Sequence, residues 1–572
     1  MIAGVGSIDL ALLVVAADDG WMPQTEEHLQ ILAYLNVKLA IVALTKSDLG
    51  NVPAVHAQIT EELRDTVFAD APIVPVSVRN DDGLVTLKNA LISQLAKVPP
   101  QADIGKPRLF VDRAFSLQGV GTVVTGTLSG GKLSTGQRVF VQPAGIKTRI
   151  RSLQSHNRDL ECALPGMRTA INLPDIDVGV SNDSIARGAV VTSEIFEPSS
   201  AIDVLLEKSA RMRDKSPSLR LLKSGASVHL HYGTGRIPAT IVLANQTALE
   251  PGKKEIAQLR LQSPVLAFIG DRFVIRDRAE QHTLAGGVVL DPDGTRGSFR
   301  SATQQKLLVA RAAAPNDVDV FLASEIHRRG TIQAASLLQK SRFSREEIAS
   351  GMQRLRQAGN IVMNGALAAD ARTWEAARKR AIDAIDQLHK KSPERAGVDL
   401  TELRGALPDQ PSELIELLIS DLCRADFVRT GSTIGRRSHH PVLPAHLQPT
   451  AAKVLLALSE KPFDPPGRKQ IIPDAQSALV LGYLIKQGDV VEVGAEILLS
   501  QKAFAEIKNE IANFITVKGP ATVSQLRQAL GTSRRVIVPL LELLDRSGFT
   551  RRFGDERKLA KETVTTSSGA LN

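Results

Sequence analysis

The chain has 572 residues, a length that exceeds one hydrophobic core and corresponds to about four domains. Its content of 43% hydrophobic and 23% charged residues is that of an ordinary soluble globular protein. The two cysteines, Cys162 and Cys423, lie far apart without metal-ligand spacing, which argues against disulfides and predicts a reducing, cytoplasmic location.

The net charge of +9 is concentrated near the C-terminus. Residues 516–561 contain ten Lys or Arg and four Asp or Glu, so this window carries +6 of the total. Such a concentration predicts a polyanionic partner, with a merely solvated basic face as the alternative. The longest apolar run, Leu10–Ala17, is far too short to span a bilayer and follows no charged signal-peptide segment, so no membrane partner is predicted.

The first hundred residues alternate apolar runs with helical patterns. Leu10–Ala17, Leu39–Leu44 and Ile73–Val78 are typical of buried parallel strands. Helices are expected over Gln24–Tyr34 and around His56–Val67. This order predicts part of a doubly wound α/β domain, whose ligands bind beyond the carboxyl ends of the strands.

A four-residue motif lies at one such strand end. Thr45-Lys46-Ser47-Asp48 resembles the guanine-specificity motif of GTPases, Asn-Lys-x-Asp, with Thr45 in place of Asn. Asp48 can accept hydrogen bonds from both N–H groups of guanine, and the stem of Lys46 can lie along the ring. Ser77 occupies the position of the second base-contacting loop of that family.

The phosphate-binding half of a G domain is absent from the sequence. No G-x-x-x-x-G-K-[ST] loop occurs, and no Asp-x-x-Gly or switch I segment precedes Leu10. Residues 1–9 resemble the segment after Asp-Val-Pro-Gly-His in translational GTPases, so we expect a G domain truncated at its N-terminus. The family uses GTP and Mg²⁺, but without phosphate-cradling amides we expect this chain to bind and hydrolyse GTP poorly.

Two antiparallel β-barrels are predicted after a proline-containing linker, because strands alternate over Arg108–Thr192 and Ala201–Leu290. In the first, Val111–Gly131 (VDRAFSLQGVGTVVTGTLSGG) is a hairpin that turns at Gly119–Gly121. Gly126, Gly130 and Gly131 are expected to allow close backbone approach. In the second, His229 and His231 share one strand face, and we interpret them as structural rather than metal-binding. A G domain with two barrels resembles the elongation-factor-Tu superfamily.

Two stretches carry a closer resemblance. Val111–Gly131 and Arg276–Asp291 (RDRAEQHTLAGGVVLD) are similar to the bacterial selenocysteine-specific elongation factors. The resemblance implies that Asp112, Arg113 and Arg168 form the pocket that binds the selenol. A selenol is largely ionised at neutral pH, whereas serine and cysteine side chains are not, so guanidinium groups would favour it. The alternative is a cluster of salt bridges on a barrel rim.

The C-terminal half repeats a helical pattern that ends in a hairpin. Its turns at Gly359, Ala425, Gly488 and Gly548 lie 66, 63 and 60 residues apart, which predicts four winged-helix modules. The last module is the basic one. Its predicted RNA-binding residues are Arg527, Arg534, Arg535, Arg551, Arg552 and Arg557. The family resemblance implies that they hold the hairpin of a selenoprotein messenger RNA.

The predicted fold is therefore multidomain. Its parts are a partial P-loop GTPase-like α/β domain (1–99), two antiparallel β-barrels (107–197 and 198–298) and four winged helices (299–372, 373–440, 441–503 and 504–572). The predicted function is an elongation factor for selenocysteine incorporation, with selenocysteinyl-tRNA, the mRNA hairpin and the ribosome as partners. A nucleotide-independent RNA tether and a winged-helix DNA-binding regulator are the alternatives. No catalytic and no metal-binding residues are predicted.

Overall fold

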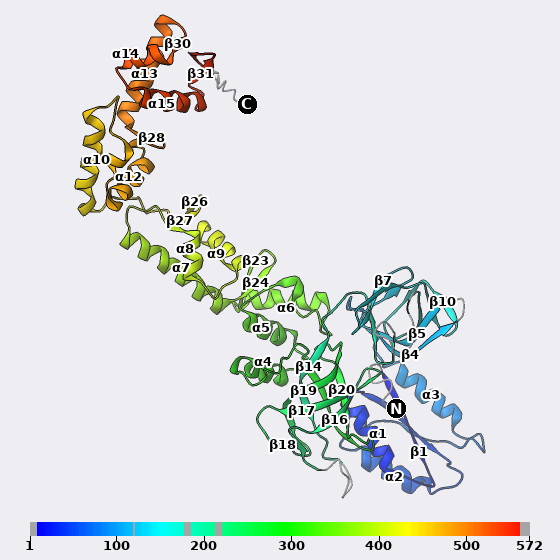
Figure 1. Ribbon diagram of the computed structural model, residues 1–572. Helices are drawn as coiled ribbons and strands as arrows, with labels where there is room; N and C mark the ends of the chain where they lie inside the picture. Colours follow the sequence, from blue (N-terminus) through cyan, green and yellow to red (C-terminus); the bar gives the residue numbers. More distant parts are fainter. Residues whose placement is uncertain (1–7, 118–120, 175, 177–184, 212–219, 561–572) are drawn as a thin grey trace, which may run out of the picture. The chain divides into compact units, whose positions relative to one another are not determined.

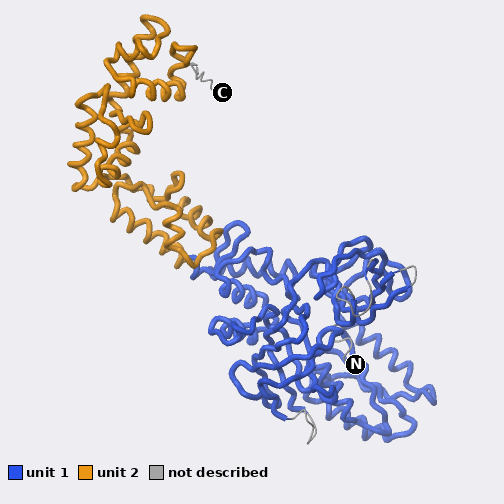
Figure 2. Tube along the Cα trace, in the orientation of Figure 1, with its two compact units in different colours: residues 1–374 blue, residues 375–572 orange. Residues whose placement is uncertain are grey.

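The computed structural model describes residues 8–117, 121–174, 176, 185–211 and 220–560. The chain divides into two compact units, residues 1–374 and 375–572 (Figures 1 and 2). The turn predicted at Gly119–Gly121 falls partly on 118–120, and the segment compared with translational GTPases falls largely on 1–7. Both of these stretches lie outside the described residues.

The first unit opens with the predicted α/β layer. A parallel sheet of order β1-β2-β3 is flanked by three helices (Figure 1). The elements are β1 (Leu10–Ala16), α1 (Pro23–Tyr34), β2 (Leu39–Thr45), α2 (Val52–Leu63), β3 (Ile73–Pro75) and α3 (Leu84–Leu95). Helix α2 begins at Val52, before the predicted His56. The Asn51 side chain caps this earlier start by accepting a hydrogen bond from the Ala54 amide. The third strand ends at Pro75, before the predicted Val78, because Ser77 pairs back onto Asp82.

The next region is an antiparallel sheet of eight strands with a separate two-stranded ribbon. Inward residues from distant strands, such as Val139 and Leu153, share one core, so the sheet curls around it. The strands are β4 (Arg108–Leu117), β5 (Gly121–Ser129), β6 (Leu133–Ser134), β7 (Arg138–Gln142), β8 (Ile146–Arg149), β9 (Ser152–Ser155), β10 (Arg158–Leu160), β11 (Cys162–Ala163), β12 (Arg168–Leu173) and β13 (Val190–Thr192).

Gly126 shows why this hairpin needs glycine. A Cβ atom on Gly126 would lie 2.2 Å from the Phe110 carbonyl oxygen, so β4 and β5 can approach only without a side chain there. At the end of the hairpin, Gly130 has a φ of +69°, in the left-handed region that favours glycine, and a Cβ atom there would lie 2.6 Å from the Lys106 carbonyl oxygen. The close approach predicted from the sequence is confirmed at both positions.

The second all-β region closes into a barrel of order β14-β19-β17-β16-β20-β21. Its alternating apolar residues, among them Leu230, Ile241 and Leu259, fill the interior. The strands are β14 (Ser199–Glu207), β15 (Leu222–Lys223), β16 (Ser227–Tyr232), β17 (Gly235–Leu243), β18 (Ala248–Leu249), β19 (Lys254–Val265), β20 (Arg272–Arg276) and β21 (Thr283–Asp291). The sequence predicted two barrels, and within the described residues only this second sheet is closed.

Helices dominate from residue 302 onward. The first unit ends with α4 (Ala302–Ala313), α5 (Val318–Arg329), β22 (Thr331–Gln333), η3 (Ala334–Ser336), α6 (Arg345–Gln357), β23 (Ile361–Asn364) and β24 (Leu367–Asp370). The three strands form a small sheet of order β22-β24-β23 that is packed against α5 and α6. This combination of helices and a hairpin is the winged-helix pattern.

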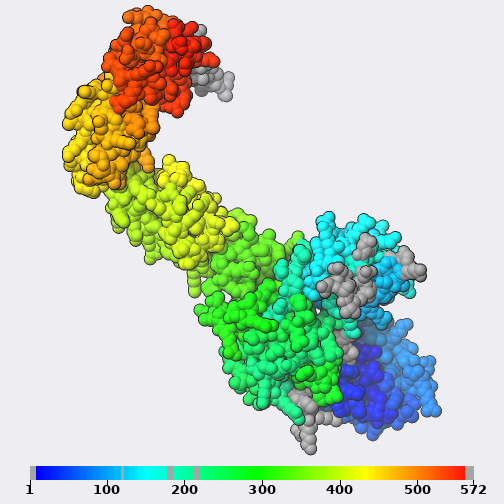
Figure 3. All heavy atoms as spheres, in the orientation of Figure 1, coloured from blue at the N-terminus to red at the C-terminus, as the bar shows by residue number. Residues whose placement is uncertain are grey.

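The same pattern of helices followed by a hairpin recurs in the second unit, and α13–β32 form the winged helix at its end (Figure 3, orange to red). The elements are α7 (Ala371–Lys391), β25 (Val398–Asp399), α8 (Leu400–Ala406), α9 (Ser412–Arg424), β26 (Phe427–Thr430), β27 (Thr433–Arg436), η4 (Ala445–Leu447), α10 (Gln448–Glu460), α11 (Arg468–Ile471), α12 (Ala475–Gln487), β28 (Val490–Gly494), β29 (Ile497–Ser500), α13 (Gln501–Lys518), β30 (Ala521–Thr522), α14 (Val523–Leu530), α15 (Arg534–Arg546), β31 (Thr550–Phe553) and β32 (Glu556–Leu559).

The predicted fold class is confirmed by a partial α/β domain, β-domains and a C-terminal winged helix. The number and boundaries of the domains stay a prediction. Among the described residues, no helix combines the length and apolar character needed to cross a membrane.

Candidate functional site

The carboxylate of Asp112 lies at an irregularity in the hairpin β4–β5. Val111 pairs with Gly126 and Arg113 pairs with Thr125, so Asp112 is the extra residue of a β-bulge. A bulge re-aims a side chain that would otherwise follow the alternation of the strand. The Thr125 hydroxyl donates to Asp112 Oδ1 at 2.6 Å, which fixes the orientation of the carboxylate.

Arg168, at the start of β12, completes this cluster. Its Nη1 donates to Asp112 Oδ2 at 2.5 Å, although the two residues are 56 positions apart. The Arg168 side chain is 53% exposed and the Asp112 side chain only 18%. Partial burial acts to raise the pKa of the Asp112 carboxyl, but hydrogen bonds from Arg168 and Thr125 outweigh burial and hold that pKa below its ordinary value. Arg113 is exposed next to it, so the structure brings the three predicted pocket residues together.

The two loops predicted to contact a guanine base also meet. The Ser77 hydroxyl donates to Asp48 Oδ1 at 2.6 Å and lowers the pKa of that carboxyl. Lys46 Nζ lies 2.7 Å from Asp18 Oδ2, and this contact raises the pKa of Lys46. The Thr45 hydroxyl donates to the Val15 carbonyl at 3.4 Å, across the β1–β2 pair. An ionised Asp48 fits the N–H groups of guanine.

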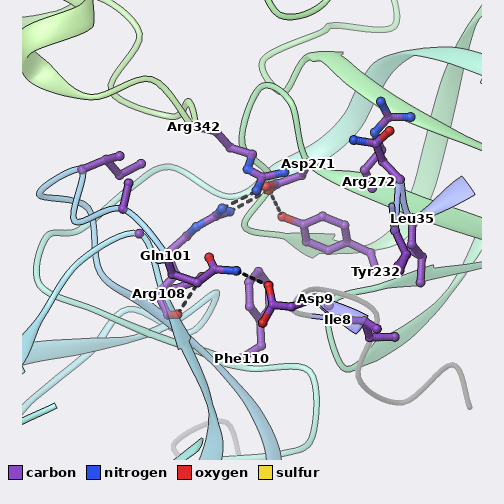
Figure 4. Close-up of a pocket in the computed structure, with 17 residues that line it drawn as sticks. Ile8, Asp9, Leu35, Gln101, Arg108, Phe110, Tyr232, Asp271, Arg272 and Arg342 are labelled. Carbon is purple, nitrogen blue, oxygen red and sulfur yellow. Dashed lines mark hydrogen bonds and ion pairs between the residues drawn. The ribbon is translucent and has the colours of Figure 1, made fainter. Parts of the chain in front are cut away.

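A buried ion pair anchors the strand that carries Asp112. Arg108, the first residue of β4, donates to both carboxylate oxygens of Asp271, at 2.6 and 2.9 Å. Tyr232 and the Phe268 amide donate to the same carboxylate. Figure 4 shows this cluster on one side of a cavity of 310 Å³ in the first unit, with a Gln101–Asp9 hydrogen bond on the other side. The pair joins the eight-stranded sheet to the barrel and thereby fixes the start of β4.

Helix α1 is held on the barrel by a second polar cluster. The Glu27 carboxylate accepts from Arg276 at 3.0 Å and from the Thr283 amide and hydroxyl at 3.0 and 2.7 Å. Nearby, the distances from Glu280 Oε1 to His229 Nδ1 and to His231 Nε2 are 3.4 and 3.8 Å. Burial lowers the pKa of His231 to about 4, so it is neutral at neutral pH.

The predicted RNA-binding arginines lie on four elements of the last module: α14, α15, β31 and β32. Arg534 and Arg535 begin α15, and Arg551 and Arg552 lie on β31, and all four are exposed. Arg527, near the end of α14, is half-buried. Arg535 also donates to the Pro465 carbonyl and lies 3.6 Å from Asp464. Backbone amides and cations at a helix N-terminus favour an anionic ligand.

The prediction that Arg557 contributes to this surface is wrong. Arg557 is 4% exposed, and its Nε donates to Asp545 at 2.9 Å, so it is part of the interior. Sequence reasoning also missed two residues of the same hairpin. Phe553 is exposed, and the Lys558 ammonium lies 5.1 Å from the centroid of its ring. An aromatic residue among basic residues is the signal that could have identified them.

Three family models match separate parts of the chain. The elongation factor Tu GTP-binding domain matches residues 1–97. The β-barrel domain of the selenocysteine-specific elongation factor matches residues 209–296, and the winged helix of elongation factor SelB matches residues 513–559.

Relatives over nearly the whole chain are selenocysteine-specific elongation factors, and a relative over half of the chain is a general elongation factor. The selenocysteine-specific elongation factor of Desulfomicrobium baculatum is 28% identical over 98% of this chain and 89% of its own length. The Escherichia coli K12 factor is also 28% identical, over 98% and 88%. Elongation factor 1-alpha of Pyrococcus abyssi is 32% identical over 51% of this chain and 76% of its own length. The crystal structure of a bacterial selenocysteine-specific elongation factor, EF-Sec, matches with a TM-score of 0.67 at 23% identity, over 98% of this chain and 88% of that one.

An α/β domain of the elongation factor Tu type, followed by two β-domains, defines the class of translation elongation factors. The matched barrel and the C-terminal winged helix distinguish one branch of that class. The chain belongs to the family of selenocysteine-specific elongation factors.

Proposed function

We propose that this chain carries selenocysteinyl-tRNA in the cytoplasm, docks on a hairpin in selenoprotein mRNA and delivers the tRNA to the ribosome. The observation that carries the proposal is the cluster of Asp112, Arg113 and Arg168. Two guanidinium groups provide the charge that favours a selenolate over a neutral hydroxyl or thiol. Asp112 holds Arg168 in place and reduces the excess positive charge, which disfavours unselective anion binding.

Guanine recognition is a separate part of the proposal. Asp48, held by Ser77, would accept from the base of GTP, and the Lys46 stem would lie along the ring. When bound with Mg²⁺, GTP supplies the phosphate-dependent switch that the family uses. Asp48, Lys46 and Ser77 fit the base of GTP, so base recognition is the part of nucleotide binding that this proposal assigns to them.

Replacement of Arg168 by alanine should reduce discrimination between aminoacyl groups. We expect affinity for selenocysteinyl-tRNA to fall at least about tenfold, because a charge-assisted contact to the selenolate is lost. Affinity for seryl-tRNA on the same tRNA body should change by less than about twofold, because the hydroxyl carries no charge to pair. Competition binding of the two aminoacyl-tRNAs measures both.

Arg158→Ala is the matched control, because Arg158 is an exposed arginine of the same sheet that lies outside the cluster. It should leave the ratio of the two affinities unchanged. Equal losses for both aminoacyl-tRNAs in Arg168→Ala would contradict a selenol pocket and favour a general tRNA contact.

The basic surface of the last module should bind RNA mainly through phosphates. In Arg534→Gln/Arg551→Gln, we expect weaker binding of an RNA stem-loop and a salt slope reduced by about 1 per removed charge. The same charge change in Lys453→Gln/Lys486→Gln, on exposed residues of α10 and α12, should have little effect. Binding measured over a series of salt concentrations tests this. Tighter binding of duplex DNA than of the stem-loop would instead favour the DNA regulator.

A further inference from the structure

Lys106 lies in the linker just before β4, and its ammonium group is buried against the α4–β24 module of the same unit. Only 9% of the residue is exposed. Its Nζ donates to the carbonyl oxygens of Leu338, Ser341 and Phe343 at 2.8, 3.2 and 2.8 Å, and to the Ser341 hydroxyl at 3.1 Å. These four oxygens belong to residues 338–343, between η3 and α6, which we call the docking turn.

An ammonium group suits this cage of oxygens. It carries three N–H donors and no acceptor, so it can serve several carbonyl oxygens that converge on one point. Burial lowers the pKa of Lys106 to about 8, so Nζ is mostly protonated at neutral pH. Among the described residues, no carboxylate lies within ion-pair distance of Nζ, so the oxygens of the docking turn compensate its charge. Loss of the ammonium would leave buried carbonyl oxygens without a donor.

The barrel holds the docking turn from a second side. Ile269 forms a β-bridge with Ser341, in which the Ile269 amide donates to the Lys340 carbonyl at 2.8 Å and the Arg342 amide donates to the Ile269 carbonyl at 3.2 Å. Leu338 has a φ of +49°, in the left-handed region that side chains rarely adopt, so contacts from outside the turn must stabilise this conformation. In helix-turn-helix proteins the helix after the turn contacts nucleic acid with its first residues, whereas this turn contacts the rest of its own unit.

The backbone of Lys106 connects the docking turn to the hairpin that carries Asp112. The Lys106 amide donates to the Gly130 carbonyl at 2.8 Å, at the end of the β4–β5 hairpin. Two residues further on, Arg108 is fixed to Asp271 in the barrel. The linker therefore holds the hairpin through its backbone, the barrel through Arg108 and the docking turn through the Lys106 side chain.

We propose that Lys106 is a positioning residue that locks the α4–β24 module onto the two β-domains, as a tethered cation in a cage of carbonyl oxygens. This role goes beyond the proposed function and does not depend on it, since no RNA takes part in it. The lock fixes the module relative to the hairpin that carries the Asp112 cluster. It requires a positive group with N–H donors, rather than the apolar stem of the side chain alone.

Hydrogen exchange of the full chain at neutral pH, followed by mass spectrometry, measures the lock at the amides of Ile269 and Arg342. We expect Lys106→Met, which keeps an unbranched apolar stem, to speed their exchange at least about tenfold, because the docking turn loses its donor. Amides of β16 and β17, within the same barrel, should keep their rates. Lys147→Met is the matched control, because Lys147 is exposed on β8, and it should change neither set.

Two outcomes of this measurement would overturn the lock. Unchanged exchange at Ile269 and Arg342 in Lys106→Met would show that the bridge to the barrel holds the turn without the ammonium. Equal acceleration at β16 and β17 would show a loss of global stability rather than the opening of one joint.

Chemical rescue separates the charge from packing. Lys106→Ala removes three methylene groups and the ammonium, which together correspond to propylammonium. Added propylammonium should restore slow exchange at Ile269 and Arg342, because it supplies both the charge and the N–H donors. Tetramethylammonium has the charge without N–H groups, and 1-propanol has the length without the charge, so neither should restore it. Failure of propylammonium, or equal restoration by 1-propanol, would refute the tethered cation.

Discussion

Replacement of Asp271 by asparagine is expected to destabilise the first unit by about 3–5 kcal/mol, because it leaves the Arg108 guanidinium buried without a counter-charge. Both side chains are less than a tenth exposed, at 7% and 9%. Burial acts to raise the pKa of the Asp271 carboxyl, but the Arg108 charge outweighs it and keeps that pKa below its ordinary value. Urea unfolding followed by tryptophan fluorescence measures the loss, since Trp21 and Trp374 both lie in the first unit.

Two variants separate loss of the pair from a general effect of mutation. Glu207→Gln breaks an exposed ion pair with Lys254, whose side chains are 42% and 58% exposed, and should cost at most about 1 kcal/mol. The double variant Arg108→Met/Asp271→Leu removes both charges and should recover much of the stability. A loss below about 1 kcal/mol in Asp271→Asn would show that the pair contributes little to the joint between the two β-domains.

This ion pair also shows a limit of sequence reasoning. Arg108 and Asp271 are 163 residues apart, and neither lies in a motif that names the other as a partner. Local patterns were enough to locate the strand: the apolar run Leu10–Ala17 predicts β1 to within one residue. The prediction that this strand is buried on both faces is wrong, because β1 lies at the edge of the sheet and Leu12 and Val14 are 45% and 59% exposed. Contacts between domains depend on how whole sheets pack, and no local pattern encodes that packing.

The candidate pocket was predicted by resemblance rather than by geometry. Period-two alternation along β4 would place Asp112 and Arg113 on opposite faces of the sheet. The bulge at Asp112 changes this, and a bulge has no reliable signature in a single sequence. The family resemblance supplied Arg168 as well, whose contact with Asp112 could not be inferred from spacing.

Arg557, in contrast, could have been placed correctly from the sequence. Around the turn at Gly554, strict alternation assigns Arg557 and Leu559 to one face and Lys558 to the other. Leucine favours the interior, so Arg557 should follow it inward and Lys558 should face solvent. Counting arginines without this alternation produced the wrong assignment.

Replacement of Glu325 by glutamine should destabilise the first unit by a similar amount, about 3–5 kcal/mol at neutral pH. Three guanidinium groups contact the Glu325 carboxylate. Arg311 Nη2 and Arg328 Nη2 lie 2.8 and 2.6 Å from Oε2, and Arg329 Nε lies 2.6 Å from Oε1. The Arg311 side chain is fully buried, so it cannot recover its charge compensation from water. Arg311 also donates to the Leu290 carbonyl, so the cluster joins α4 and α5 to the barrel.

The effect should depend on pH in a defined direction. Burial acts to raise the pKa of Glu325, but the charges of Arg328 and Arg311 lower it from an ordinary 4.5 to about 2. A carboxyl whose pKa is lower in the folded than in the unfolded chain stabilises the fold at pH values above the unfolded-state pKa. For Glu325 this contribution is lost as the pH falls from about 4.5 through about 2. The difference between wild type and Glu325→Gln should therefore be largest at neutral pH and should narrow as the pH falls below about 4.5.

Midpoints of urea unfolding, followed by tryptophan fluorescence at a series of pH values, measure this narrowing. Glu250→Gln changes the same charge at an exposed turn and should show no comparable loss. A loss in Glu325→Gln that stays constant between pH 7 and pH 3 would mean that its cause is altered packing rather than the lost charge. If the stability difference between wild type and Glu325→Gln instead narrows as the pH falls, the Glu325 carboxylate is the charge that compensates the arginines joining α4 and α5 to the barrel.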